Sequence, residues 1–280
     1  MHPSRQNVRR SAFSVTIVCG LLGLATEPAP AALLSLIDGN SSADFDTSSS
    51  GNNYNWFVDG VDRLSQQAFW YRVGGVGPEL SVHSLAIGVQ GTTDSNFDGN
   101  PDTLFVRYVG AGFNVETRYT LDGGTPGSGA SDLAEQISII NTGESALDYH
   151  FFQYADFDLS AADSILFTNA NTVRQSGPGS ELTETVVTPV PSHREGGFFP
   201  VTLNELNDAL PTTLNDLPAI GVPIGAGDMT WAYQWDVLIN PGDTFQISKD
   251  KNLKPIVPEP GTALAIAAIG ILSAVRRRSR

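Results

Sequence analysis

The feature that most constrains the fold is a series of short strand-like segments separated by Gly, Pro, Asn and Asp. Such spacing favours an all-β chain, and we expect a two-sheet antiparallel sandwich that is jelly-roll-like. One short helix is expected at residues 203–210, and the Pro- and Gly-rich run 177–227 is expected to be an insertion or ragged edge. The predicted strands are residues 54–58, 68–73, 80–90, 103–109, 113–121, 133–141, 146–159, 229–239 and 244–248.

Short turn sequences predict which of these strands pair. Gly110-Ala111-Gly112 separates residues 103–109 from 113–121, so a tight hairpin is expected there. The same argument joins 133–141 to 146–159 around residues 142–144, and 229–239 to 244–248 across residues 240–243. Three hairpins are therefore predicted.

The amino-terminal segment has the three-part order of a secretory signal peptide. Basic residues precede an apolar run at 12–25, and small residues follow it at 29–32. We expect residues 1–32 to direct export through the Sec translocon and to be cut by signal peptidase after Ala31 or Ala32. The basic residues are Arg5, Arg9 and Arg10.

The only cysteine, Cys19, lies inside that apolar run. Val18 precedes it, where lipoprotein processing needs a small residue, so a lipid anchor is disfavoured. The mature chain then has no cysteine, which excludes a disulfide, a thiol nucleophile and a thiolate metal site.

Residues 33–256 carry nine basic and 28 acidic residues, a strongly negative balance. A surface of this charge repels nucleic acid and attracts cations. Nucleic-acid binding is therefore not expected. Residues 33–248 are predicted to form the sandwich, with a linker at residues 249–256.

The carboxy-terminal segment, residues 257–280, begins with a proline-rich break at Pro258, Glu259 and Pro260. An apolar run at 262–275 follows, and Arg276, Arg277 and Arg278 come after it. A helix of this length spans about 21 Å, short of the roughly 30 Å hydrocarbon core. We expect a transmembrane helix that anchors the chain transiently in the inner membrane, with the arginines on the cytoplasmic side.

Together these residues resemble the PEP-CTERM sorting signal. The resemblance implies processing by exosortase, a membrane-embedded cysteine transpeptidase, and delivery to the cell surface or the extracellular polysaccharide matrix of a Gram-negative-type bacterium. It also implies a role connected with exopolysaccharide or biofilm. The segment 114–159 resembles a β-sandwich module of bacterial surface proteins, on the strength of residues 137–143 and 151–159.

One loop has the spacing of a weak calcium site. Oxygen-bearing side chains alternate along it, and Gly99 supplies the turn, but Phe105 stands where a bidentate glutamate belongs. The alternative is a set of Asx turns in which the side chains bond their own backbone. The candidate ligands are Asp94, Asn96, Asp98, Asn100 and Asp102.

Asp156 and Asp158 share one face of a predicted strand, where they suit a metal or a carboxylate pair, or mark a polar outer face. Trp231, Tyr233 and Trp235 also share a face, and form either a sugar-stacking platform or core. No catalytic motif is present, so no catalytic residues are assigned and a non-enzymatic structural or adhesive role is expected. A carbohydrate-binding module and a secreted hydrolase are the alternatives.

Overall fold

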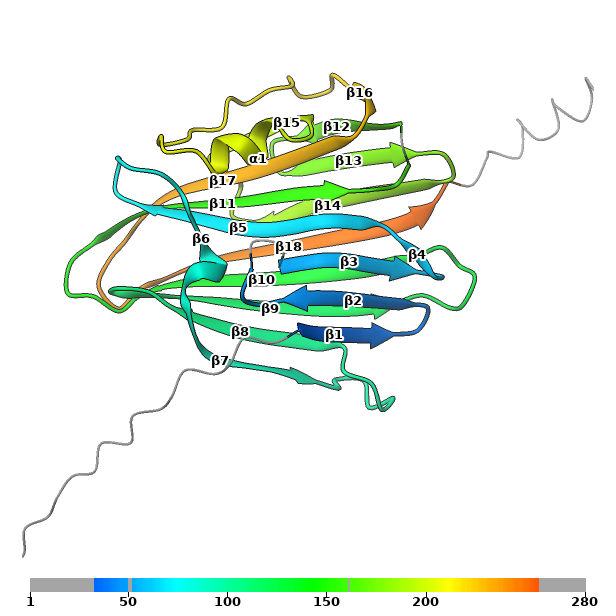
Figure 1. The fold of residues 1–280 in the computed structure, drawn as a ribbon, viewed down its shortest axis with the longest axis horizontal. Coiled ribbons are helices and arrows are strands. Elements are labelled where there is room, and N and C mark those ends of the chain that lie inside the picture. The colour runs from blue at the N-terminus through cyan, green and yellow to red at the C-terminus, as the bar shows by residue number, and fades with distance from the viewer. Residues whose placement is uncertain (1–32, 50–51, 161, 257–280) are drawn as a thin grey trace, which may run out of the picture.

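The computed structural model describes residues 33–49, 52–160 and 162–256, and these form two β-sheets packed face to face (Figure 1). Each sheet has nine strands within the described residues. The predicted all-β sandwich is confirmed. The predicted signal peptide and the sorting segment lie outside the described residues.

Sheet A runs in the order β1-β2-β3-β5-β11-β17-β15, with β4 beside β3 and β6 beside β5. Its pairings are antiparallel except for a short parallel contact between β3 and β5. Its strands are β1 (Leu33–Asp38), β2 (Ser41–Asp46), β3 (Asn52–Val58), β4 (Val61–Asp62), β5 (Leu64–Val73), β6 (Leu80–Ser81), β11 (Leu147–Phe157), β15 (His193–Phe198) and β17 (Met229–Ile239).

Sheet B runs in the order β16-β12-β13-β14-β18-β10-β9-β8-β7, with all pairings antiparallel. Its strands are β7 (Ala86–Thr93), β8 (Thr103–Val109), β9 (Phe113–Gly123), β10 (Ser131–Asn141), β12 (Asp163–Asn169), β13 (Thr172–Gly177), β14 (Ser180–Thr188), β16 (Ile224–Gly227) and β18 (Thr244–Pro255).

Helical structure is sparse. The expected short helix is present as α1 (Val201–Leu206), which lies against β15 and β17 (Figure 1). A 3-10 turn, η1 (Val82–Ser84), divides the segment predicted as one strand at 80–90 into β6 and β7. Among the described residues, no helix has the length and apolar character needed to cross a bilayer.

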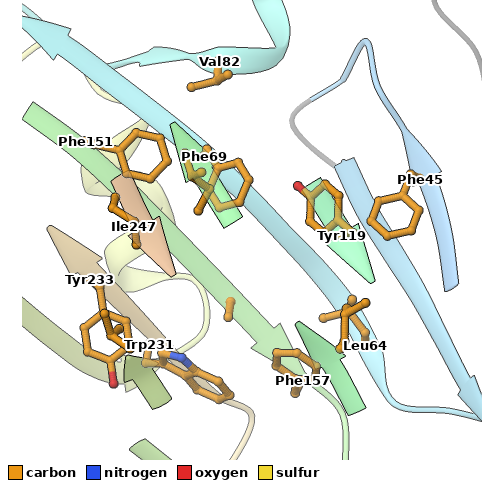
Figure 2. Packing of buried hydrophobic residues seen from close by; sticks show 14 of the residues in the cluster. Phe45, Leu64, Phe69, Val82, Tyr119, Phe151, Phe157, Trp231, Tyr233 and Ile247 are labelled. Atoms are coloured by element: carbon orange, nitrogen blue, oxygen red, sulfur yellow. The ribbon is translucent and has the colours of Figure 1, made fainter. Parts of the chain in front are cut away.

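The main core lies between the sheets, because strand residues alternate inward and outward with period two. In β10, for example, every second side chain from Ser131 to Asn141 is buried. Large aromatic side chains meet at the centre (Figure 2): Phe157 stacks on Trp231 with ring centroids 5.3 Å apart, and Phe69 packs on Phe151. This buried apolar area supplies the main stabilisation of the sandwich.

Of the three predicted hairpins, one is confirmed and two are wrong. Strands β8 and β9 pair across Gly110-Ala111-Gly112 as expected. Strands β10 and β11 belong to different sheets, as do β17 and β18, so their connections cross the sandwich as arches. The two arches touch, because the Asn141 side chain donates to the carbonyls of Ser145 and Ile239, each at 2.8 Å.

The predicted linker at residues 249–256 is wrong for all but its last residue. Residues 249–255 continue β18, which lies between β14 and β10 in the middle of sheet B. Lys249 and Lys251 point inward and are buried, which the strongly polar sequence did not suggest. The run at residues 177–227, expected to be an insertion or ragged edge, contains β14 inside sheet B and the edge strands β15 and β16, while its residues 199–223 contain no strand.

Candidate functional site

The outer face of sheet A carries the candidate site, and a second apolar cluster lies on that face. Its residues come from β5, β11 and β17 and are covered by α1 and the segment after it. The cluster consists of Ala68, Trp70, Phe152, Tyr154, Leu206, Leu214 and Ala232, with Leu203 packed against it. Even-numbered residues of β11 therefore face outward, away from the main core.

Buried polar contacts hold the segment after α1 onto this face. Arg72 pairs with Glu79, and its guanidinium also donates to the Thr212 carbonyl oxygen at 3.0 Å. The Thr212 amide donates to Glu79 at 2.9 Å, and Trp70 Nε1 donates to Asn207 at 3.2 Å. The segment after α1 is therefore an integral cover of sheet A, fixed by charged side chains that are themselves buried.

Three aspartates converge where β11 ends and β17 begins. Asp156 lies opposite Thr230, so continuing the antiparallel register places Asp158 opposite Asp228. One carboxylate oxygen from each residue lies within 4.8 Å of the others, and we call this group the carboxylate cluster (Asp156, Asp158 and Asp228). Asp156 is buried, while Asp158 and Asp228 are exposed.

The electrostatics of the carboxylate cluster favour the neutral acid at its buried member. Burial raises the pKa of Asp156 to about 7, and the negative charges of Asp228 and Asp158 add to the effect. The pKa of Asp158 is also raised, first by burial and then by Asp228 and neighbouring aspartates. These carboxylates therefore repel one another unless a proton or a cation intervenes.

A second polar group on the same face is built from histidine and aspartate. His150 lies opposite Asp236 in the β11–β17 ladder, and its Nδ1 is 2.5 Å from Asp236 Oδ1. His193 on β15 contacts Asp216 at 2.9 Å and Asp236 at 3.7 Å. We call this group the histidine cluster (His150, His193, Asp216 and Asp236). His193 and Asp216 also line a pocket of about 190 Å³.

The predicted calcium loop adopts the alternative that the sequence left open. Asp94 accepts hydrogen bonds from the amides of Phe97, Asp98 and Gly99, and Asn96 accepts one from Asp98. Asp98 in turn accepts from the Asn100 amide at 2.8 Å. Asx turns thus occupy oxygens that a cation would need, and calcium binding at this loop stays a prediction.

Asp102 closes the same loop from its far end. Its carboxylate is buried and accepts hydrogen bonds from the amides of Ser95 and Asn96 and from the Ser95 hydroxyl. Burial acts to raise the pKa of Asp102, but these hydrogen bonds outweigh it and the pKa is lowered. The charge is therefore already satisfied by the loop itself.

Of the two alternatives that the sequence left open for the aromatic row, the structure shows core rather than a sugar-stacking platform. Trp231, Tyr233 and Trp235 have 0%, 0% and 1% of their surface exposed. They project between the sheets, since odd-numbered residues of β17 face inward, and Trp231 Nε1 donates to buried Glu184 at 2.7 Å. No sugar ring can stack on a row that the opposite sheet covers.

A buried charged network accompanies these aromatic side chains in the interior. Lys249 lies 2.5 Å from Glu135 and 3.4 Å from Glu184, and Lys251 also pairs with Glu135. Gln153 receives a hydrogen bond from Lys249 at 2.5 Å. Burial acts to raise the pKa of Glu135, but the two ammonium groups outweigh it and lower the pKa to about 2. The four charged groups therefore satisfy one another inside the sandwich.

Comparison with protein families finds one match, at residues 257–279. The carboxy-terminus carries a PEP-CTERM protein-sorting motif. The motif implies an exported cell-surface protein that exosortase processes, and the resemblance predicted from Pro258-Glu259-Pro260 is confirmed. No curated protein matches the chain in sequence.

The fold upstream of the PEP-CTERM motif is similar to known structures at low sequence identity. A protein of Escherichia coli K12 assigned as an aldose 1-epimerase is 10% identical, with a TM-score of 0.52 and coverage of 81% of this chain and 100% of that one. The Slr1438 protein of Synechocystis is 9% identical, with a TM-score of 0.52 and coverage of 84% and 100%. These likenesses establish the fold alone, a two-sheet β-sandwich that this chain shares with both proteins.

Sequence reasoning located part of the two outer clusters. It placed Asp156 and Asp158 on one face of a strand, and the structure brings them together in the carboxylate cluster. It missed Asp228 and Asp236, which join the two clusters only because β11 pairs with β17. Asp228 lies immediately before the predicted strand 229–239, and Asp236 lies near the end of that strand. The turn at residues 240–243 predicts pairing of this strand with residues 244–248, so it does not place either aspartate beside β11.

Proposed function

We propose that the mature protein is a non-catalytic structural or adhesive component of the cell surface and its exopolysaccharide matrix. The observation that carries the proposal is the position of the sorting motif. Strand β18 ends at Pro255, and the PEP-CTERM match begins at residue 257. Processing in that motif would therefore leave the sandwich next to its point of attachment or release, without a long stalk.

The surface charge supports the same role. Four of the nine basic residues in 33–256 are buried, whereas 20 of the 28 acidic residues are not. The ratio of acidic to basic residues is therefore higher on the accessible surface than in the composition. Such a surface is highly hydrated and attracts cations. Such a surface suits a component of a hydrated matrix in which cations bridge anionic groups. The buried basic residues are Arg72, Arg194, Lys249 and Lys251.

Deletion of residues 258–280 in the native host tests this proposal. We expect the truncated protein to leave the surface and matrix fraction and to accumulate in the periplasm, because exosortase has nothing to recognise. A matched control replaces Ser279, at the end of the matched segment, with alanine and keeps the wild-type location. An unchanged location of the truncated protein would contradict the proposal.

A second candidate function is saccharide binding at the histidine cluster. It is favoured by the half-exposed imidazole and carboxylate groups beside the pocket, which can exchange hydrogen bonds with sugar hydroxyls. The fold likeness to a protein assigned as an aldose 1-epimerase supports a saccharide as the ligand class.

Calorimetric titration with exopolysaccharide from the host tests this candidate. We expect Asp236→Asn to weaken binding at least tenfold, because Asp236 contacts both histidines. Asp122→Asn, at an exposed position of β9 in the other sheet, removes the same charge and leaves binding within twofold. Neither form is expected to accelerate aldose mutarotation followed by polarimetry. Unchanged binding by Asp236→Asn would place the saccharide elsewhere, and accelerated mutarotation would make the protein an enzyme.

A further inference from the structure

Among the described residues, the charges that act on Asp156 and Asp158 in the carboxylate cluster are all negative. The charges that act on Asp156 are those of Asp228 and Asp158, and those that act on Asp158 are Asp228, Asp163 and Asp62. Every one of these is a carboxylate. A site of this kind is costly in the apo protein and is stabilised by a bound cation.

The buried member of the cluster has an unsatisfied oxygen. Asp156 is 3% exposed, and its Oδ1 has no hydrogen-bond partner in the part of the chain that the structure describes. A buried acceptor without a partner costs free energy, and native structures seldom leave one without a reason. One carboxylate oxygen of Asp156 lies within 4.8 Å of an oxygen of Asp158 and of Asp228, so the Asp156 side chain is directed into the cluster.

The spacing fits a calcium ion. Two oxygens on opposite sides of Ca²⁺ lie about 4.6–5.2 Å apart, because each Ca–O distance is about 2.3–2.6 Å. The three oxygens lie within 4.8 Å of one another, so one calcium ion can reach all of them. Mg²⁺ demands near-ideal octahedral geometry, whereas the flexible shell of Ca²⁺ tolerates carboxylates held by the ends of two different strands. The exposure of Asp158 and Asp228 leaves room for the water ligands that complete a calcium shell.

We propose that Asp156, Asp158 and Asp228 bind a calcium ion that ties the end of β11 to the start of β17. This site is separate from the loop at residues 94–102, whose Asp94 and Asp102 carboxylates already accept several amide hydrogen bonds. It is also independent of the proposed surface role and of saccharide binding, because it uses neither the sorting motif nor the histidine cluster.

Thermal unfolding of the mature protein, in EGTA and in 10 mM CaCl₂, tests the proposal. For a site with millimolar affinity we expect calcium to raise Tm by about 3–6 °C. The variants Asp156→Asn and Asp228→Asn lose this shift. As a control, Glu144→Gln removes the same charge at an exposed position outside the carboxylate cluster and outside the loop at residues 94–102, and this variant keeps the shift in Tm.

Terbium luminescence locates the ion directly. Tyr154 lies two residues before Asp156 on the same outward face of β11, so its ring is close enough to sensitise Tb³⁺ bound in the cluster. We expect sensitised emission that calcium displaces, and at least a tenfold loss of emission in Asp228→Asn, whose exposed side chain is replaced without disturbing the core. This measurement separates lost binding from lost folding.

Three outcomes would overturn the assignment. The first is a full calcium shift in Asp156→Asn and Asp228→Asn. The second is loss of the shift in Asp98→Asn, which would place the ion in the loop at residues 94–102. The third is an equal shift with 10 mM MgCl₂, which would remove the case for calcium.

Discussion

At the scale of single residues, Asp156 makes stability depend on pH. Its pKa rises from the ordinary 3.8 to about 7 in the folded protein, mainly through burial. Between pH 4 and 7 the folded state therefore holds a proton that the unfolded state has released. The Asp156 carboxyl group therefore contributes to the free energy of unfolding at low pH, and this contribution is lost as the pH rises to about 7.

Replacement of Asp156 by asparagine is expected to remove this dependence. In EGTA, the variant should match the wild type near pH 4 and exceed it near pH 8 by on the order of 2 kcal/mol. Urea unfolding at both pH values measures the difference. A constant difference across this range would show that the carboxyl group does not titrate as described.

Lys249 is expected to be the most sensitive lysine of β18. Changing it to methionine leaves Glu135 and Glu184 with one ammonium group between them, and breaking a buried ion pair from one side costs about 3–5 kcal/mol. Lys254→Met is the matched control on the same strand. Its exposed pair with Glu181, at 3.2 Å, contributes less than about 1 kcal/mol. Guanidinium unfolding of both variants compares them, and equal losses would contradict the buried network.

At the scale of elements, strand location was largely predictable and strand pairing was not. Residues 103–109 and 229–239 match β8 and β17, because period-two alternation bounded by turns identifies a strand without reference to its neighbours. Gly, Asn and Pro turns, however, serve hairpins and arches alike. The turns at residues 142–144 and 240–243 therefore gave no signal that the chain changes sheets there.

The carboxylate cluster shows the same limit at the level of a site. A shared face for Asp156 and Asp158 follows from spacing along one strand, whereas Asp228 enters through pairing between distant strands. Lys249 and Lys251 were misplaced for a different reason. Lysine is seldom buried, so the sequence alone favours an exposed position for both residues. Their inward orientation is explained by the opposing carboxylates of Glu135 and Glu184, whose positions follow only from the fold.

Asn141 is expected to be the residue on which the two arches depend. Its side chain donates to Ser145 and Ile239 and accepts from the Gly143 amide at 2.9 Å. Asn141→Ala should lower the free energy of unfolding by about 2–4 kcal/mol, because buried backbone groups lose their partners. Asn240→Ala, which removes one exposed bond to Asp243, should cost less than about 1 kcal/mol. Similar losses in urea unfolding would contradict a special role for Asn141.

At the scale of the whole molecule, the last strand of the described residues, β18, completes the sandwich from inside sheet B. Removal of residues 249–280 should abolish folding, since it takes most of β18 and both lysines from the centre of sheet B. Removal of residues 258–280 alone should leave near-UV circular dichroism and cooperative melting intact. A folded 249–280 deletion would show that the segment is dispensable after all.

The position of β18 also determines how the protein would respond to mechanical force. A pull on the carboxy-terminus acts along a strand that is hydrogen-bonded on both sides, to β14 and to β10. Such a pull shears two ladders at once, whereas an edge strand would peel away bond by bond. A protein fastened to a cell through this end would thus transmit drag from its surroundings into the middle of sheet B, where the sandwich resists extension best.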